Sequence, residues 1–159
     1  MIKKIKYAKL ILKHKAYVAW AGLTKVGGIP ITQLIIHDWS KFSPSEFFAY
    51  QRQFDKGQEK DPDQWEAALQ HHYNHNAHHP EYWIKADGTP LPMPEVYVRE
   101  MVADWYAASK AYQGHWDIKE WVEKSVPRFN LHPVTKHHLN KILMDQDIFL
   151  DCLDEVPHD

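Results

Sequence analysis

Two short stretches, SPSE and DPDQ, carry the strongest helix-start signals of this chain. In the first, Ser43 is suited to the N-cap, Pro44 to the first helical position, and Glu46 to closing a capping box. In the second, Asp61 precedes Pro62 in the same way. Patterns that alternate apolar and polar residues, as strands do, are nearly absent, so we expect an all-α fold.

Helical periodicity and breaking residues divide the chain into about six to seven helices. The first of them is ended by Gly27, Gly28 and Pro30. Residues 79–94 are expected to form a loop because they hold four prolines and a glycine. The helices are expected at residues 2–23, 31–39, from 43 onward, 61–76, 95–113, 117–127 and 133–152. No repeat or long linker divides the chain, which predicts one compact helical bundle over residues 1–159.

Charge and cysteine content limit the partners and the compartment. The net charge of -2 gives no general attraction for nucleic acid, although the first helix is rich in lysine and no acidic residue precedes Asp38. The longest apolar run of the first helix, AYVAWAGL, is too short to cross a membrane. A single cysteine, Cys152, excludes an intrachain disulfide and fits a reducing compartment. We therefore expect a cytoplasmic protein that binds neither membranes nor nucleic acid.

Histidine is unusually frequent, with 12 residues in a chain of 159. His14 lies on the inward-facing stripe of the first helix, together with Leu10 and Val18. His37 and Asp38 are neighbours within an apolar segment that is expected to be helical, where their side chains would point roughly 100° apart. Burying ionisable groups is costly unless something compensates them, so this pair needs a partner.

The segment HHYNHNAHHPEYW is expected to present its polar side chains on two adjoining faces of one helix. His72, Asn76 and His79 follow a helical spacing, and so does a second set, His71, His75 and His78. Imidazole is the commonest side-chain ligand of transition metals, so this spacing favours a metal site; a solvated surface is the alternative.

Two carboxylates four residues apart, Glu100 and Asp104, share a face of the long helix at residues 95–113. Asp104 lies nearer the inward boundary of that face. An exposed carboxylate pair is the alternative interpretation. The tryptophans that flank the motifs, Trp39, Trp83 and Trp105, are expected in the core or in a pocket wall.

The order of these residues resembles that of a known superfamily. His14, the pair His37–Asp38, and Asp104 reproduce the H…HD…D order of HD-domain proteins. The stretches HDWSKFSPSEFFAY, HYNHNAHHPEYW and MPEVYVREMVADW resemble, more narrowly, the uncharacterised DUF5662 family of phage and bacterial proteins, over roughly residues 8–110. The resemblance implies a divalent metal ion held by these four residues, and such an ion would compensate the buried pair.

The resemblance also implies a function, because phosphohydrolases dominate the HD superfamily. We expect hydrolysis of a nucleotide or another small phosphate ester by a metal-activated water. Nitrogen and oxygen ligands without thiolate suit Mn, Fe, Co, Ni or Zn. HD proteins with extra histidines before the last aspartate often bind two ions, which adds His72, His78 and His79 as expected ligands.

Further residues are expected to bind or activate the substrate. Lys15, Lys41 and Asn76 are the expected substrate-binding residues, because a phosphate group needs cations and donors around it. Asp38 and Lys41 are expected to be catalytic. In related HD nucleotidases the position of Lys41 resembles one that carries a catalytic glutamate, so Glu46, or else Glu81, is expected to supply the general acid.

Two other functions stay open at this point. One is a di-iron oxygenase of the HD type, which uses the same ligand arrangement with additional histidines. The other is a non-catalytic binding protein in which the metal only stabilises the fold. A homo-oligomeric state is also left open.

Overall fold

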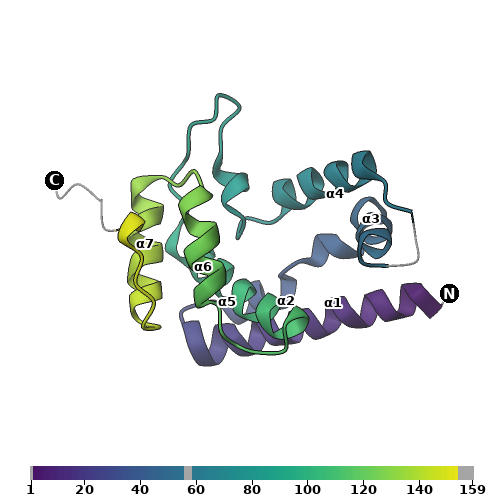
Figure 1. Ribbon diagram of the computed structural model, residues 1–159, viewed down its shortest axis with the longest axis horizontal. Coiled ribbons are helices and arrows are strands. Elements are labelled where there is room, and N and C mark those ends of the chain that lie inside the picture. The colour runs from purple at the N-terminus through teal and green to yellow at the C-terminus, as the bar shows by residue number, and fades with distance from the viewer. Residues whose placement is uncertain (1, 56–58, 154–159) are drawn as a thin grey trace.

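The computed structural model describes residues 2–55 and 59–153, and all of its regular structure there is helical (Figure 1). Seven α-helices confirm the expected all-α bundle of six to seven helices: α1 (Ile2–Ala21), α2 (Ile31–Ile36), α3 (Pro44–Phe54), α4 (Pro62–His75), α5 (Glu95–Tyr112), α6 (Lys119–Ser125) and α7 (Pro133–Met144). Within these ranges the extended pairing is limited to one bridge, Ile84 with Pro90. None of the described helices is long and apolar enough to span a membrane.

The start of α4 confirms the prediction from DPDQ. The Asp61 carboxylate accepts a hydrogen bond of 3.0 Å from the backbone N–H of Gln64, and Pro62 occupies the first turn. The start of α3 agrees only in part. Pro44 begins the helix after Ser43, but no side chain caps it, so the predicted capping box is wrong. Glu46 is fully buried instead and is bonded to side chains of α4.

The end of α2 differs from the prediction, and the difference affects the candidate site residues His37 and Asp38. This helix ends at Ile36, so His37 and Asp38 are not helical, and Asp38 has a left-handed backbone with φ 54°. The ammonium group of Lys15 donates hydrogen bonds to the backbone carbonyls of Ile35 and His37, and thereby satisfies groups that the helix end leaves unpaired. The pair therefore lies at a break between α2 and a 3-10 turn, Trp39–Phe42.

The turn between α1 and α2 brings these two helices into contact. After α1 the chain makes one π-helical turn, Gly22–Val26, before Gly27 turns away with φ 68°. A Cβ atom at Gly22 would lie 2.7 Å from Cδ2 of Leu34 and 3.2 Å from Cδ1 of Ile29, so a larger residue there would force these side chains to move.

The C-terminal helix α7 is shorter than expected. We predicted a helix to residue 152, but α7 ends at Met144. Asp147 takes a left-handed conformation with φ 57°, and the N–H of buried Ile148 returns to the carbonyl of Leu143 at 3.0 Å. This is the hydrogen bond of a Schellman ending, with aspartate at the position that glycine usually holds. Cys152 follows as an exposed free thiol.

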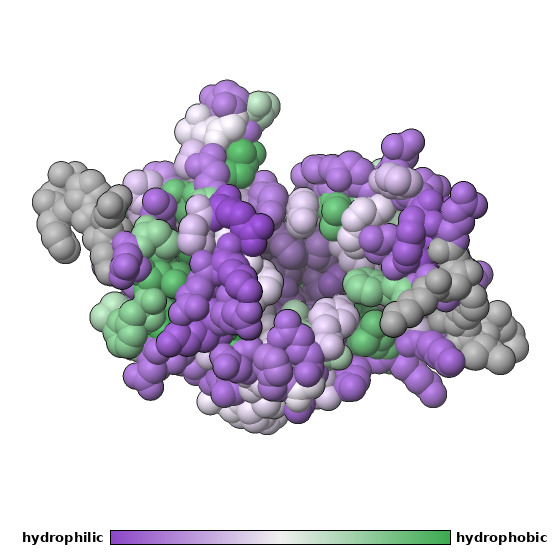
Figure 2. All heavy atoms as spheres, viewed as in Figure 1, coloured by the Kyte–Doolittle hydropathy of each residue, from purple (hydrophilic) through white to green (hydrophobic). Residues whose placement is uncertain are grey.

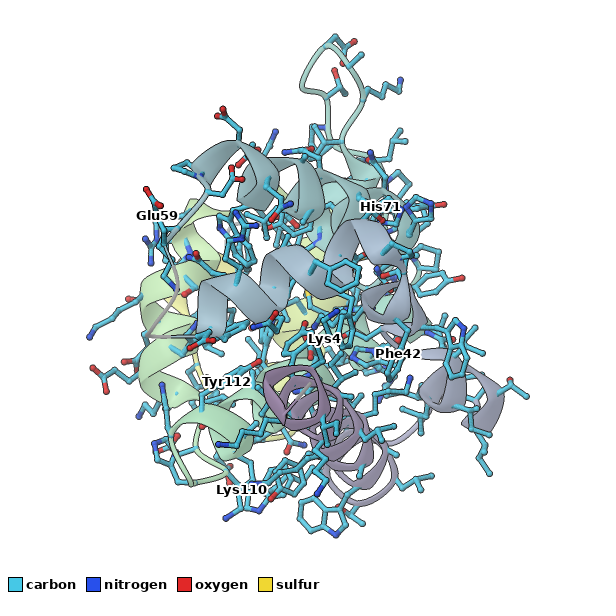
Figure 3. All side chains as sticks on the ribbon, turned by 90° about the vertical axis from the view of Figure 1, so that its right-hand side faces the viewer. Lys4, Phe42, Glu59, His71, Lys110 and Tyr112 are labelled. Carbon is cyan, nitrogen blue, oxygen red and sulfur yellow. The ribbon has the colours of Figure 1, made fainter. Side chains whose placement is uncertain are left out.

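Two apolar clusters flank a polar region. The larger surrounds α5, which packs against α1 and α7. The smaller lies between α1, α3 and α4 and contains Tyr7, Ile11, Ala49, Tyr50 and Ala68. Figure 3 looks along α1, with α3 crossing above it and α4 beyond. The residues between the two clusters form the site described next.

Candidate metal centre

The four residues of the H…HD…D order meet at one place, although they come from three parts of the chain. The Nε2 atom of His14 lies 2.7 Å from Oδ1 of Asp104 and 3.6 Å from Oδ2 of Asp38. The Nε2 atom of His37 lies 3.3 Å from Oδ2 of Asp38 and 3.5 Å from Oδ1 of Asp104. The four ligand atoms lie within 4.8 Å of one another, which is close enough to hold one ion.

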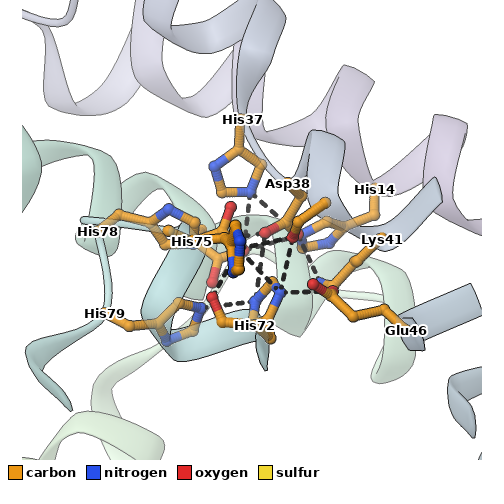
Figure 4. A network of polar contacts seen from close by, with 12 residues as sticks. His14, His37, Asp38, Lys41, Glu46, His72, His75, His78 and His79 are labelled. Atoms are coloured by element: carbon orange, nitrogen blue, oxygen red, sulfur yellow. Dashed lines mark hydrogen bonds and ion pairs between the residues drawn. The ribbon is translucent and has the colours of Figure 1, made fainter. Parts of the chain in front are cut away.

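A second group of possible ligands adjoins the first and shares Asp38 with it (Figure 4). The Nε2 atoms of His72 and His78 lie 3.4 Å and 3.6 Å from Oδ1 of Asp38, and Nε2 of His79 lies 2.9 Å from that of His72. The two carboxylate oxygens of Asp38 thus face two different groups of imidazoles. This geometry would place one carboxylate between two ions.

The histidines of the second group do meet, but the prediction that they share the face of one helix is wrong. Since α4 ends at His75, His78 and His79 belong to the turn that follows, not to a helical face. The remaining two, His71 and His75, stack on each other with ring centroids 4.0 Å apart, outside both groups.

Buried side-chain atoms without a hydrogen-bond partner indicate whether these residues suit a cation. Several buried atoms of the two groups have no hydrogen-bond partner: Nε2 of His14, His37 and His78, and Oδ1 of Asp38 and Asp104. Even the 2.7 Å pair, His14 with Asp104, does not have the alignment of a hydrogen bond. Buried polar atoms are rarely left unpaired, and these converge on a common space. The buried residues could therefore hold a metal ion, and their nitrogen and oxygen donors suit a divalent transition metal.

Glu100 forms a third group of possible ligand atoms with His37 and His78, and it was not recognised as a site residue from the sequence. It is 3% exposed, so the interpretation of Glu100 and Asp104 as an exposed pair is wrong for Glu100. Its carboxylate accepts hydrogen bonds from Nδ1 of His37 at 2.8 Å and from Gln33 at 2.5 Å, and lies 3.5 Å from Nδ1 of His78. Holding the Nδ1–H leaves Nε2 of His37 free to bind a metal.

Glu46 has the same relation to the second group. Its carboxylate accepts hydrogen bonds from Nδ1 of His72 at 2.9 Å and from Nδ1 of His71 at 2.7 Å. Burial raises the pKa of Glu46, but the hydrogen bond and charge of His72, together with the hydrogen bonds of Ser40 and His71, outweigh burial, and the net pKa is lowered. An ionised carboxylate behind His72 orients that ring, so the geometry does not favour the general-acid role expected for Glu46.

Asn76 is also placed behind the ligands. Its side-chain amide donates to the hydroxyl of Ser40 and to the backbone carbonyl of His72, both at 2.7 Å. Both donor positions are therefore used within the protein, at the end of α4. The geometry favours a role in holding His72 over the expected contact with substrate.

The two lysines that were expected to bind phosphate differ in their surroundings. Lys41 points into the centre, where its ammonium group lies 2.5 Å from Oδ2 of Asp38. It lines a narrow depression together with His14, Tyr50 and Tyr112. Lys15, in contrast, is bonded to backbone carbonyls at the end of α2. Of the two, Lys41 is the one placed to meet an anion.

Electrostatics hold the centre together without an ion. Burial by itself lowers the pKa of His37, but Asp38, Asp104 and Glu100 outweigh it and raise the pKa well above its usual value. Burial likewise raises the pKa of Asp38, yet the charges of His37, Lys41 and His72 together outweigh burial, and the net pKa is strongly lowered. His78 behaves differently, because burial and the charge of His37 lower its pKa to about 3. The carboxylates around His37 thus favour a positive charge at this position, which a bound cation would also supply.

Metal binding is therefore expected to depend on pH. His37 must lose its proton before Nε2 can bind an ion, so below the raised pKa of His37 each ion bound there releases a proton. Affinity for Mn²⁺ should fall about tenfold for each unit by which the pH is lowered. Titration calorimetry in buffers with different ionisation enthalpies measures this release directly. An affinity independent of pH would contradict the assignment of His37 as a ligand.

A cavity of about 340 Å³ opens beside the two groups, in the hollow that Figure 2 shows between the α6 side and the α3–α4 side. His79 and Asp104, one from each group, belong to its wall. Glu81, an exposed residue, lines it as well, and the partial burial of its carboxyl group raises its pKa. Trp105 is the one tryptophan of the three flanking the motifs that lines this wall; Trp39 is 65% exposed.

Comparison with known proteins gives one family match. A model of a family of unknown function (DUF5662) matches residues 3–145. That range contains every residue of the two groups of possible metal ligands. No curated protein and no solved structure matches this chain.

Proposed function

Because the chain belongs to the DUF5662 family, whose function is unknown, its site has to indicate its activity, and we propose a metal-dependent phosphohydrolase of the HD type. Its substrate would be a small phosphate ester, such as a nucleotide. One observation carries the proposal: two groups of ligand atoms without hydrogen-bond partners share Asp38 and adjoin a cavity of about 340 Å³. Paired metal ions in such a setting are typical of enzymes that hydrolyse phosphate esters.

Both ions would be held by residues already described. The first would bind His14, His37, Asp38 and Asp104, and the second Asp38, His72, His78 and His79. Mn, Fe, Co, Ni and Zn all suit this donor set. Such ions, when bound, lower the pKa of water and polarise a phosphoryl oxygen.

The other residues of the site would bind and orient. Lys41 would bind a phosphoryl oxygen with its ammonium group, which lies beside Asp38. Glu46 and Glu100 would keep the rings of His72 and His37 turned toward Asp38. The organic part of the ester would occupy the cavity. Glu46 would not be the general acid, because its carboxylate is bonded to Nδ1 of His72.

Replacement of Lys41 by methionine is expected to weaken binding of anions at this site. A hydrogen bond between charged groups contributes roughly 1.5–3 kcal/mol, so KM for a phosphate ester, and the inhibition constant of inorganic phosphate, should rise about tenfold or more. Lys13→Met is a matched control, because Lys13 is exposed and adjacent to His14 in sequence. Unchanged constants in the Lys41 variant would show that Lys41 does not bind the phosphate.

The activity itself is tested with chelator-treated protein to which Mn²⁺ or Co²⁺ is returned. Release of phosphate is measured over a panel of nucleotides and other phosphate esters, and we expect metal-dependent turnover of at least one of them. Oxygen consumption by the iron-loaded protein, without phosphate release, would support the di-iron oxygenase instead. Tightly bound metal with neither activity would support a non-catalytic binding protein.

A further inference from the structure

The cavity beside the candidate metal centre is rich in aromatic rings and contains no lysine or arginine in its wall. Its ring-bearing residues from α4, α5, α6 and the segment after α6 are Tyr73, Trp105, Tyr112, Trp121 and Phe129. Trp105 and Trp121 meet with ring centroids 4.8 Å apart and planes at 52°, and so form an angled wall. Such a surface does not suit phosphate, which needs cationic partners.

One carboxylate on this wall, Glu81, is influenced by the charge of His72 but forms no ion pair with it. Within residues 2–55 and 59–153, no lysine, arginine or histidine forms an ion pair with Glu81. The other carboxylate of the wall, Asp104, is directed at His14 and His37. The Glu81 side chain is exposed to solvent, so its carboxylate is accessible to a cation that enters the cavity. Aromatic rings with such a carboxylate are also the surroundings in which organic cations are bound.

We infer that the cavity binds a substituted ammonium group, as the organic end of a small zwitterionic phosphate ester. The rings of Trp105 and Trp121 would contact the cation, and Glu81 would supply its counter-charge. The inference extends the proposed function, on which the phosphate end depends. Because His79 and Asp104 line the cavity and belong to the two metal groups, one short molecule can reach both.

The size and the charge of the cavity narrow the choice of ligand. A volume of about 340 Å³ is at the small end of the range for ligand pockets, so the organic group is small. The phosphate group of the ester would bind at Lys41, which lies beside Asp38 and outside the cavity wall. In this arrangement Glu81 acts as a counter-charge and not as the general acid.

The binding experiment uses the full chain and a pair of ligands of equal shape. Choline and its uncharged analogue 3,3-dimethylbutan-1-ol are titrated against the protein by calorimetry or tryptophan fluorescence. Choline should bind about tenfold more tightly or better. Glu81→Gln should remove that preference without changing the affinity for the alcohol, whereas Glu123→Gln, on an exposed position of α6, should leave the preference intact. Equal affinities in the wild type, or tighter binding of an uncharged planar ligand such as adenosine, would overturn the inference.

A kinetic arm separates this inference from the proposed function. Hydrolysis of choline phosphate is compared with that of 3,3-dimethylbutyl phosphate in the presence of Mn²⁺. We expect a higher kcat/KM for choline phosphate, lost in Glu81→Gln through KM. If kcat falls equally for both esters in that variant, Glu81 is a general acid and the inference fails. If neither ester is hydrolysed while choline still binds preferentially, the phosphohydrolase proposal loses support and the cation site stands.

Discussion

Replacing Asp38 with asparagine is expected to abolish metal binding at both groups of ligands and, with it, the proposed activity. Its two carboxylate oxygens face different groups of imidazoles, so the substitution takes a charged ligand from each. Loss of a residue that only orients a ligand typically costs 10–100-fold in metal affinity, so loss of the shared ligand should cost more than about 100-fold. Elemental analysis of the purified variant, with phosphate release as the second readout, measures both effects.

Asparagine is chosen because Asp38 has φ 54°. Among residues with a Cβ atom, asparagine and aspartate tolerate this left-handed conformation best, so the backbone at the break should persist. A matched control exists in Asp147, which has φ 57° and lies after α7, away from both groups. Asp147→Asn should keep the full metal content. An Asp38→Asn protein that retains wild-type metal would refute the assignment of this carboxylate.

Removal of metal by a chelator is expected to lower the thermal stability substantially. An ion that binds the folded chain alone stabilises it by about 2.7 kcal/mol at one hundred times its dissociation constant. For a domain of this size that corresponds to a rise in Tm of roughly 5–11 °C. The physical cause is the set of buried atoms without hydrogen-bond partners at His14, His37, Asp38, His78 and Asp104, which an ion would satisfy. Calorimetric scans with and without added Mn²⁺ measure the shift.

The same scans on two variants distinguish specific binding from general binding to a histidine-rich chain. Asp38→Asn should show no shift with Mn²⁺. His137→Ala should keep the full shift, because His137 is exposed on α7 and outside both groups. A Tm that does not respond to Mn²⁺, Co²⁺ or Zn²⁺ in the wild type would be incompatible with a metal ion in this centre.

Local signals were sufficient to predict the class of fold and many helix boundaries. The start of α4 follows from Asp61 and Pro62, whose effect depends only on the next few residues. Predictions failed where a distant group decided the conformation. Glu46 does not cap α3, because His71 and His72, 25 and 26 residues away, bind its carboxylate. Helix α2 ends earlier than predicted, at the point where the ammonium group of Lys15 on α1 donates a hydrogen bond to the backbone carbonyl of Ile35.

The site was predictable to the extent that its residues follow a recognisable order. His14, His37, Asp38 and Asp104 were expected together and do meet. Glu100 was missed as a site residue, because its role depends on His37, 63 residues away in sequence. The one local sign was its place one helical turn before Asp104 on α5.

The most direct measurement is anomalous diffraction from crystals of the protein grown with Mn²⁺. Two peaks are predicted on opposite sides of the Asp38 carboxylate, about 3.5–4 Å apart, as in other centres with two ions. One peak should lie among His14, His37 and Asp104, and the other among His72, His78 and His79. A map with no peak beside Asp38, or with manganese only at exposed histidines such as His75 and His137, would contradict the account.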